Sequence, residues 1–322
     1  MILFRPSCMF AGLAALLSLM KAAHAQPGFR WQERPGESIA LCDGDSVIWQ
    51  FNYGPALAKP LFHPLALADS PPLTVDRPPD HAWHHGLWFS WVFVNGVNYW
   101  EHDPQTGRPV GRTQWSDVKI VRNPDYSADI SLQLAYGEGD RPPVLRESRT
   151  LRVKPRDSAG AYAIDWQCAF TAETEPASVS VRPIPPMPGG VAWGGYGGLS
   201  VRLAEGLEDR RASTAEAAAL FDAAGIYRGQ SPACDYSGVT GGVLAGIALL
   251  DHPDNPRHPS PWYAIRSDMS YLNAAIMAPG PIGIPPHETL TLRYRAVVHP
   301  GRWDATALTE AARRYAADAA EP

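Results

Sequence analysis

The sequence lacks most of the signals that identify helical, membrane-spanning and nucleotide-binding proteins. Strand and helix patterns do not alternate along it, which argues against a parallel α/β fold. It contains no G-x-S-x-G nucleophile elbow and no P-loop, and its glycine-rich "WGGYGGLS" lacks G-x-G-x-x-G spacing. After the first 25 residues, no stretch is long and apolar enough to cross a bilayer. These absences argue against an α/β-hydrolase, a dinucleotide-binding enzyme and a protein with several membrane spans.

Cysteine is also scarce. Four cysteines occur in 322 residues, and Cys8 lies in the N-terminal leader. The remaining three allow one disulfide but imply no disulfide framework, and the sequence does not decide whether Cys42 pairs with Cys234. Cys168 shares one strand face with apolar residues in "YAIDWQCAF", so we expect it to be a core thiol.

Residues 1–25 have the form of a secretory signal peptide. Arg5 precedes the apolar run "FAGLAALLSLM", and a small-x-small "AHA" ends at Ala25. The alternative is an uncleaved membrane anchor. We expect an exported protein, periplasmic or extracellular, with no membrane contact after cleavage. Loss of Arg5 and Lys21 changes the formal net charge from −5 to −7. Because no basic stripe remains, this charge argues against a nucleic-acid partner.

Residues 26–322 are expected to form a single all-β domain. Apolar and polar residues alternate in "DISLQLAY" and "TLTLRYRAVV", and similar runs are "VIWQFNY", "WSDVKIV", "LRESRTLRV" and "VLAGIALL". The 32 prolines and 28 glycines separate these runs at intervals typical of antiparallel sheets. The predicted architecture is a large antiparallel β-sandwich with long functional loops. Two helices are predicted, a short one at Ser213–Ala224 and a longer one at Asp304–Ala319 with Asp304 as its cap.

The densest group of chemically active residues is "PDHAWHHGLWFSW", which runs from Pro79 to Trp91. It holds three of the ten histidines and three of the eleven tryptophans. Both faces of Leu87–Val94 are apolar, which predicts a central strand buried on both sides, with Trp88 and Trp91 in the core. Polar residues lie directly before this strand, where loops often carry binding and catalytic groups. They are Asp80, His81, His84 and His85, and Trp83 among them offers a flat face to a sugar ring.

Two kinds of chemistry fit these histidines. A histidine beside an aspartate can transfer protons near neutral pH, and histidines at this spacing can also bind a metal. No cofactor is certain, and we keep one divalent ion as a hypothesis. Its candidate ligands are His81, His84 and His85, with His63 or His258 in addition. A purely structural role for the three histidines is the alternative.

A second group of polar residues is found in "LLDHPDNPRHPSPWY". The apolar run Val243–Leu250 leads into a loop where proline recurs every third residue, which restricts the loop to few shapes. We interpret this loop as a preorganised ligand wall, with a capped surface turn as the alternative. Its polar residues are Asp251, His252, Asn255, Arg257 and His258. Weaker candidates elsewhere are Lys59 and His63 in "KPLFHPL", His102 in "WEHD" and Asp235 in "CDYSG".

Four segments together resemble a known family. "KPLFHPL", "DRPPDHAWHHGLWFSWVFVNGVNYWE", "CDYSG" and "DHPDNPRHPSPWY" are similar to exported bacterial proteins of unknown function that carry the label "methane oxygenase PmoA family". Many members show "DHPHHRGLWF", so Trp83 and His85 stand where those members have His and Arg. The resemblance runs from about Lys59 to Val298, and it implies a carbohydrate-related role and a galactose-mutarotase-like β-supersandwich. The matching positions are His63, Asp80, His81, His84, Asp235, Asp251, His252, Asn255, Arg257 and His258.

From these features we expect an exported carbohydrate-active enzyme, a hydrolase, lyase or epimerase, with a small-molecule or oligosaccharide substrate. The two polar loops are expected to meet in one site, because neither group of charges can easily be satisfied alone. The predicted catalytic residues are His84, His85, Asp251, His252 and His258. The predicted substrate-binding residues are His63, Asp80, His81, Trp83, Asp235, Asn255 and Arg257. The alternatives are a non-catalytic saccharide-binding protein and a metal-dependent oxidoreductase, as the family label suggests.

Overall fold

The alternating sequence pattern gives three antiparallel sheets and one helix. The computed structural model describes residues 28–173, 175–180 and 195–318. The first sheet has nine strands in the order β1 (Phe29–Arg34), β2 (Ser38–Asp43), β3 (Ser46–Asn52), β4 (Leu61–Leu65), β5 (Leu87–Ser90), β13 (Gly198–Arg202), β19 (Tyr271–Ala274), β18 (Pro261–Ile265) and β15 (Ile226–Gln230).

The second sheet has eight strands, and several of them are long. Their order is β14 (Glu208–Thr214), β16 (Ala233–Thr240), β17 (Val243–Asp251), β21 (Thr289–Pro300), β11 (Tyr162–Ala172), β10 (Leu145–Val153), β9 (Ala128–Glu138) and β8 (Gly111–Arg122). In β10, "LRESRTLRV", buried and exposed residues alternate without a break. Such alternation is what a sheet with one face in the core and one in solvent requires.

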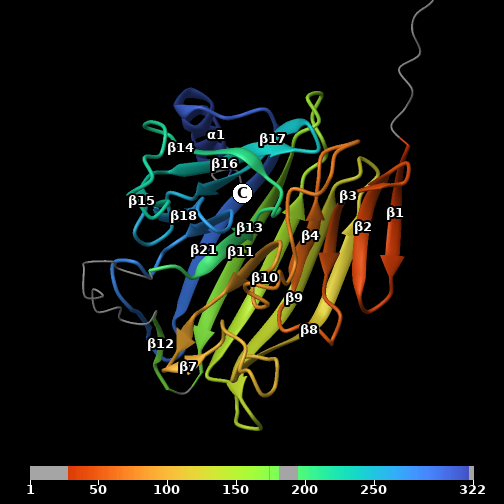
Figure 1. The fold of residues 1–322 in the computed structure, drawn as a ribbon. Coiled ribbons are helices and arrows are strands. Elements are labelled where there is room, and N and C mark those ends of the chain that lie inside the picture. The colour runs from red at the N-terminus through yellow and green to blue at the C-terminus, as the bar shows by residue number, and fades with distance from the viewer. Residues whose placement is uncertain (1–27, 174, 181–194, 319–322) are drawn as a thin grey trace, which may run out of the picture.

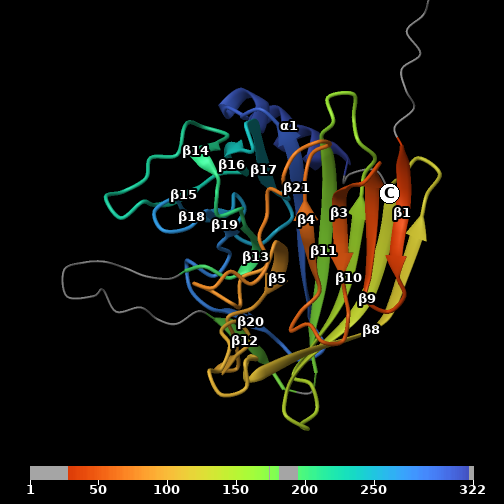
Figure 2. The ribbon, with the colours of Figure 1, turned by 45° about the vertical axis from the view of Figure 1, so that its right-hand side comes forward.

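The two large sheets pack face to face through aromatic side chains. Phe62 on β4 contacts Trp166 on β11 with ring centroids 6.0 Å apart, and Phe89 on β5 contacts Phe170 on β11 at 5.3 Å. Figures 1 and 2 show strands β1–β4 running alongside the long strands β8–β11. The prediction of a large antiparallel β-sandwich with a C-terminal helix is therefore confirmed.

The buried strand after the histidine motif is shorter than predicted. β5 ends at Ser90, opposite Gly198 of β13, and both faces of its four residues are buried. Phe93–Val94 forms β6 instead, which turns through Asn95 and Gly96 into β7 (Val97–Asn98). Both turn residues have positive φ, as a tight hairpin turn requires. With β12 (Ala177–Ser180) and β20 (Ile282–Ile284), these strands form a small third sheet.

The C-terminal helix is confirmed and the other predicted helix is wrong. α1 spans Ala305–Asp318, and Asp304 caps it by accepting a hydrogen bond from the Ala307 amide at 2.9 Å. The helix packs against β14, β16 and β17 (Figure 1). Ser213 and Thr214 belong to β14, and a turn follows in which the Thr214 hydroxyl accepts hydrogen bonds from the amides of Glu216 and Ala217. This local bonding competes with a helix start.

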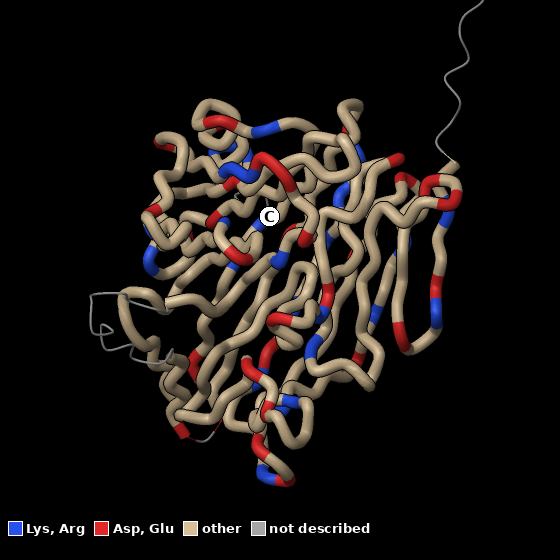
Figure 3. The backbone as a smooth tube through the Cα atoms, viewed as in Figure 1, with Lys and Arg blue, Asp and Glu red and all other residues tan. Residues whose placement is uncertain are grey.

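The three cysteines of the described chain are buried and unpaired. Cys168 is fully buried, which confirms the predicted core thiol. Cys42 and Cys234 do not form a disulfide with each other. Within the described residues, no helix is long and apolar enough to span a membrane. Lys and Arg lie among Asp and Glu over the described fold (Figure 3). The predicted signal peptide, residues 1–25, lies outside the described residues.

Candidate active site

The histidine motif lies between β4 and β5, where the two strands approach unusually closely. A Cβ atom at Gly86 would lie 2.2 Å from the Phe62 carbonyl oxygen and 2.9 Å from the Cβ of His63. Only glycine therefore fits at this position. The Gly86 carbonyl accepts a hydrogen bond from the Arg202 amide of β13 at 2.8 Å. Gly86 thus fixes the backbone directly after His84 and His85 at the start of a buried strand.

His85 forms a dyad with Asp76, which was not among the predicted site residues. Its Nδ1 lies 2.6 Å from Oδ1 of Asp76, and the residue is only 1% exposed. The hydrogen bond indicates that Nδ1 carries the proton and that Nε2 carries a lone pair. Burial lowers the pKa of His85, and the contact with Asp76 opposes that effect without cancelling it. Nε2 is therefore a neutral proton acceptor near pH 7.

His84 is buried in a stack of aromatic rings. It stacks on His81 at 4.6 Å and on Tyr271 of β19 at 5.1 Å between ring centroids. Burial lowers the pKa of His84 well below its usual range, and the nearby positive charge of Arg202 contributes to the same shift. His84 is therefore neutral, so its ring can form hydrogen bonds but carries no positive charge.

Lys59 is a buried amine, and no carboxylate among the described residues pairs with it. It is 1% exposed, and its Nζ donates one hydrogen bond, at 3.2 Å, to the Tyr99 carbonyl. Nζ also lies 5.7 Å from the centre of the Trp100 ring. Burial lowers the pKa of Lys59 to about 7. Its charge lowers the pKa of His84, His85 and His102, so it belongs to the same electrostatic neighbourhood. A lysine in this state can both give and take a proton near neutral pH.

The outer part of the site is partly exposed. The side chain of His81 is 31% exposed, and its Nδ1 lies 3.0 Å from Oδ2 of Asp80. Asp80 also accepts a 2.6 Å hydrogen bond from Nη2 of Arg202, whose side chain is buried. The Trp83 ring lies 5.2 Å from His81 and 6.3 Å from His102. Burial lowers the pKa of His102 to about 4.

Several buried nitrogen atoms in this neighbourhood lack any hydrogen-bond partner in the described chain. Such atoms are costly to bury, so a group of them in one place indicates a site for a polar ligand or ordered water. The ring contacts among His84, Trp88 and Trp100 show that this group is local. The atoms are Nδ1 of His84, Nε2 of His85, Nε2 of His102, Nε1 of Trp88, Nε1 of Trp100, and Nε and Nη1 of Arg202.

Two further predicted binding residues have different surroundings. His63 lies beside the histidine site, because its Nδ1 is 3.0 Å from the Thr74 hydroxyl and Asp76 influences its pKa, which burial lowers. Asp235 lies in the second sheet, fully buried and 2.8 Å from Nε2 of His299. The structure therefore associates His63 with the histidine site and Asp235 with an internal hydrogen bond of the second sheet.

The proline-rich loop forms its own network beside α1. Nδ1 of His258 lies 2.7 Å from Oδ2 of the buried Asp251, and burial raises the pKa of Asp251. Asn255 donates to Asp251 at 2.8 Å and to the Arg293 carbonyl at 2.6 Å, and it accepts from the Arg293 amide at 2.7 Å. These bonds tie the loop to β21.

The remaining residues of this loop also have internal partners. Arg257 donates to the carbonyl oxygens of Ile276, Gly280 and Pro281. The Nδ1 atom of His252 accepts a hydrogen bond from the Asp254 amide at 3.0 Å, and its ring meets Tyr315 of α1 edge to face. The loop thus satisfies most of its polar groups by itself, as a structural turn does.

Strands β18 and β19 place the two polar groups at opposite ends. Tyr271, which stacks on His84, pairs with Ile265 at the end of β18. His258 precedes Pro261, where β18 begins. Pro261 and Ile265 are about 13 Å apart at 3.3 Å per residue of strand. The two loops therefore do not meet, which corrects the expectation of one joint site. The catalytic roles expected for Asp251, His252 and His258 stay predictions.

The described residues contain no set of side chains arranged as metal ligands. Among them, no group of three or more His, Cys, Asp or Glu side chains is arranged to hold a metal ion. Nδ1 of His81 and Nδ1 of His85 each lie beside an aspartate oxygen. The hypothesis of one divalent ion at His81, His84 and His85 stays a prediction.

Asp76 and Arg202 are the main site residues that sequence reasoning missed. Asp76 lies in "DRPPDHAWHHG", nine residues before His85, so an acidic residue near the motif was a usable signal. Arg202 offered no local signal, because it is 122 residues away from Asp80 and only strand pairing brings it there.

The comparison with protein families identifies the chain. A model described as "Family of unknown function (DUF6807)" matches residues 38–313. The chain belongs to this family. The matched range contains every residue of the histidine site and of the proline-rich loop. No curated protein matches the chain.

Two solved structures show distant similarity to this member of the family. The galactosidase domain of alpha-galactosidase-sucrose kinase, AgaSK, is 9% identical, with a TM-score of 0.43 over 84% of this chain and 42% of that one. The family member thus spans under half of that chain. The Slr1438 protein from Synechocystis sp. PCC 6803 is 8% identical, with a TM-score of 0.27 over 85% of this chain and 96% of that one.

Proposed function

We propose that this protein is an exported carbohydrate-active enzyme that works by proton transfer at the histidine site. One observation carries the proposal. Buried nitrogen atoms of His84, His85, Trp88 and Trp100 lack partners in the described chain and share one neighbourhood. A ligand with several hydroxyl oxygens would supply the acceptors and donors that these atoms need.

His85 is the proposed base. Its bond to Asp76 orients the ring and leaves Nε2 free to accept a proton. The same arrangement of carboxylate, imidazole and reacting atom recurs in many enzymes that use histidine as a general base. Asp76 is the positioning residue, because it stabilises the imidazolium that forms when His85 takes up a proton.

Lys59 is the proposed acid. In its protonated form the buried ammonium group stabilises negative charge that develops on a substrate oxygen, and it can donate a proton to that oxygen. The low polarity around Lys59 strengthens this interaction. His84 and the Trp88 indole are proposed to bind substrate hydroxyl groups.

This set of groups favours an epimerase or a lyase over a hydrolase with two carboxylates. Hydrolysis by two carboxylates needs both of them available on either side of the glycosidic bond. Here Asp76 is engaged by His85, and Asp80 is engaged by His81 and Arg202. We propose that Nε2 of His85 removes a proton from a carbon next to a carbonyl or carboxyl group. The resulting enolate then regains a proton, which gives epimerisation, or expels the oxygen substituent on the next carbon, which gives elimination.

The test is solvent deuterium incorporation into saccharides. Uronides and keto-glycosides are incubated with the protein in D2O, and exchange at carbon is followed by NMR together with the absorbance of unsaturated products. We expect the wild-type protein to exchange or eliminate with at least one of these sugars and the His85→Gln variant to fail. Binding of a sugar by the wild-type protein without exchange, elimination or hydrolysis would instead favour a non-catalytic saccharide-binding protein. Elemental analysis of the pure protein, with activity measured after chelation, tests the oxidoreductase that the "PmoA" label suggests.

A further inference from the structure

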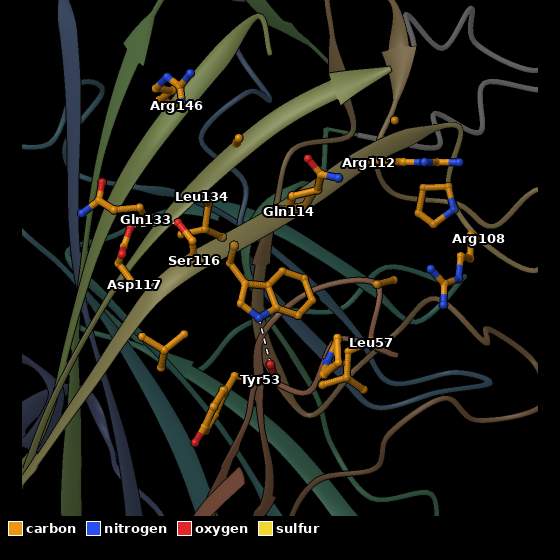
Figure 4. Close-up of a pocket in the computed structure, with 18 of the residues that line it drawn as sticks. Tyr53, Leu57, Arg108, Arg112, Gln114, Ser116, Asp117, Gln133, Leu134 and Arg146 are labelled. Atoms are coloured by element: carbon orange, nitrogen blue, oxygen red, sulfur yellow. Dashed lines mark hydrogen bonds between the residues drawn. The ribbon is translucent and has the colours of Figure 1, made fainter. Parts of the chain in front are cut away.

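A second cleft of the described chain lies outside the histidine site. It is a cleft of about 1180 Å³ beside the edge strand β8, here called the β8 cleft. Its walls come from β8, β9 and β10 on one side and from residues 53–58 and 108–111 on the other. Figure 4 shows Arg108 and Arg112 on the opposite side of the view from Arg146 and Gln133. The proposed proton transfer uses none of the residues in this cleft.

Strand register arranges polar side chains in rows along one wall of the cleft. Gln114 of β8 pairs with Ala135 of β9, which pairs with Arg146 of β10. Ser116 pairs with Gln133 in the same way. Residues in register on neighbouring strands share one face and lie about 5 Å apart per strand. This wall therefore presents amide, hydroxyl and guanidinium groups at regular spacing, which suits a ligand with repeated oxygen atoms.

An aromatic residue in the cleft is held in a fixed orientation. Trp115 is partly buried, and its Nε1 donates a 2.8 Å hydrogen bond to the Tyr53 carbonyl (Figure 4). Because its polar atom is already satisfied, the exposed part of the indole is apolar. A fixed apolar ring that lines the cleft suits the face of a sugar ring.

The cleft is basic although the protein as a whole is acidic. Three arginines line it against one acidic residue, Asp117, whereas the whole chain has a net charge of −5. Arg146 is paired with Glu173. Arg112 is exposed, and no hydrogen bond or ion pair joins its side chain to any other residue that the structure describes. An exposed arginine without an internal partner is available for an anionic ligand.

We infer that the β8 cleft binds an acidic saccharide chain, one that carries carboxylate groups. This inference rests on the proposed carbohydrate function and goes beyond it by naming a second site and the charge of its ligand. The arginines would bind the carboxylates through paired N–H donors, Gln114 and Gln133 would bind hydroxyl groups, and Trp115 would contact a ring face.

The β8 cleft is adjacent to the histidine site. Ala58 lines the cleft, and the next residue is Lys59. Gly111, which also lines the cleft, lies against the ring of Tyr99, and the Tyr99 carbonyl accepts the Lys59 hydrogen bond. A chain held in the cleft would keep its other residues near the histidine site at a high effective concentration.

The test is affinity electrophoresis in gels that contain either polygalacturonate, which is acidic, or dextran, which is neutral. We expect polygalacturonate to retard the full-length protein, dextran not to do so, and added salt to weaken the retardation. Arg112→Ala should weaken binding about tenfold, the effect of one charge-assisted contact. Arg211→Ala is the matched control, because Arg211 is an exposed arginine of β14 outside the cleft.

Three results would overturn the inference. They are equal retardation by both polymers, no retardation of the wild-type protein by polygalacturonate, and equal binding by the Arg112→Ala and Arg211→Ala variants. The proposed catalysis is tested separately with a short saccharide. If Arg112→Ala loses polymer binding but no saccharide exchanges or reacts with the wild-type protein, the cleft stands and the proposed reaction fails. If short saccharides react and polymer binding is absent, the reaction stands and the cleft assignment fails.

Discussion

Nδ1 of His85 lies 2.6 Å from Oδ1 of Asp76, and Nε2 of the same ring is buried without a partner in the described chain. One nitrogen of the ring is thus fixed by a carboxylate, while the other is left for a group that the protein does not supply. Removal of a carboxylate that orients a catalytic histidine costs up to about 10⁴ in rate in a well-studied protease. The proposed chemistry depends on this pair of residues.

The first prediction concerns this pair. Asp76→Asn should lower kcat by about 10²- to 10⁴-fold, because an amide cannot hold the same tautomer or stabilise the imidazolium. His85→Gln should lower kcat at least as far. Steady-state kinetics with the sugar found by deuterium exchange measure both effects, and thermal unfolding checks that the variants are folded. His287→Gln, at an exposed position before β21, is the control. Full activity in a folded Asp76→Asn variant would show that the pair is structural.

The second prediction concerns the stability cost of Lys59. Its pKa is about 7 in the folded protein and about 10.5 in the unfolded chain. The folded state therefore binds fewer protons between these values, so this group's contribution to stability rises as pH increases from 7 to 10.5. Below pH 7 the buried charge costs up to about 5 kcal/mol at 1.36 kcal/mol per unit. Lys59→Met should thus stabilise the protein at pH 6, with a smaller gain at pH 10, while activity is lost.

Thermal unfolding at the two pH values measures this difference, and the wild-type protein is compared in the same buffers. A lysine that stabilises the fold would instead lower the stability of the protein when it is replaced. If Lys59→Met destabilises the protein at pH 6, the amine supports the fold rather than the reaction.

The third prediction is the pH dependence of the rate. His85 must be neutral to accept a proton, and its pKa is lowered, so activity should rise with pH in a limb below 6.5. Lys59 must be protonated to act as an acid, so activity should fall as pH increases through about 7. Lys59→Arg keeps the positive charge at all these pH values but cannot donate a proton, so it should remove the falling limb and lower the maximum rate. Profiles of kcat/KM against pH for the wild-type protein and the variant check the assignment. If the variant keeps the falling limb, that limb belongs to a group other than Lys59.

The fourth prediction separates the proline-rich loop from the proposed chemistry. Asn255 makes three hydrogen bonds, to Asp251 and to the Arg293 backbone, and it is buried. Asn255→Ala should therefore destabilise the protein by about 2–4 kcal/mol, because buried partners lose their bonds. Activity per folded molecule should be retained. Chemical denaturation measures the change in stability, and kinetics at low temperature measure the activity per folded molecule. If the folded variant loses activity, the proline-rich loop takes part in the reaction.

The sequence predicts most of the fold for a simple physical reason. Strands such as β9, β10 and β11 have one buried face, so their period of two is visible in the residues. The prediction fails where the conformation depends on individual hydrogen bonds, because these leave no periodic pattern in the sequence. In the segment Ser213–Ala224, alanine-rich composition suggests a helix, yet the Thr214 hydroxyl and the pairing of β14 with β16 decide its conformation.

The site is predictable only in part, because pairing between distant strands completes it. The motif residues His84 and His85 could be found from their local density. Arg202 reaches Asp80 because β13 pairs with β5, and no local pattern in the sequence reveals that pairing. The expected contact between the two polar loops fails for a similar reason, since the strand pairing places the loops at opposite ends of β18 and β19.

A crystal structure of the protein with the saccharide that it binds tests the proposed role of His85 most directly. The proposed mechanism predicts sugar oxygens within hydrogen-bonding distance of Nδ1 of His84 and of the Trp88 indole nitrogen. It also predicts that an exchangeable C–H group points at Nε2 of His85. A saccharide bound only elsewhere, with these three nitrogens unchanged from the free protein, would contradict it.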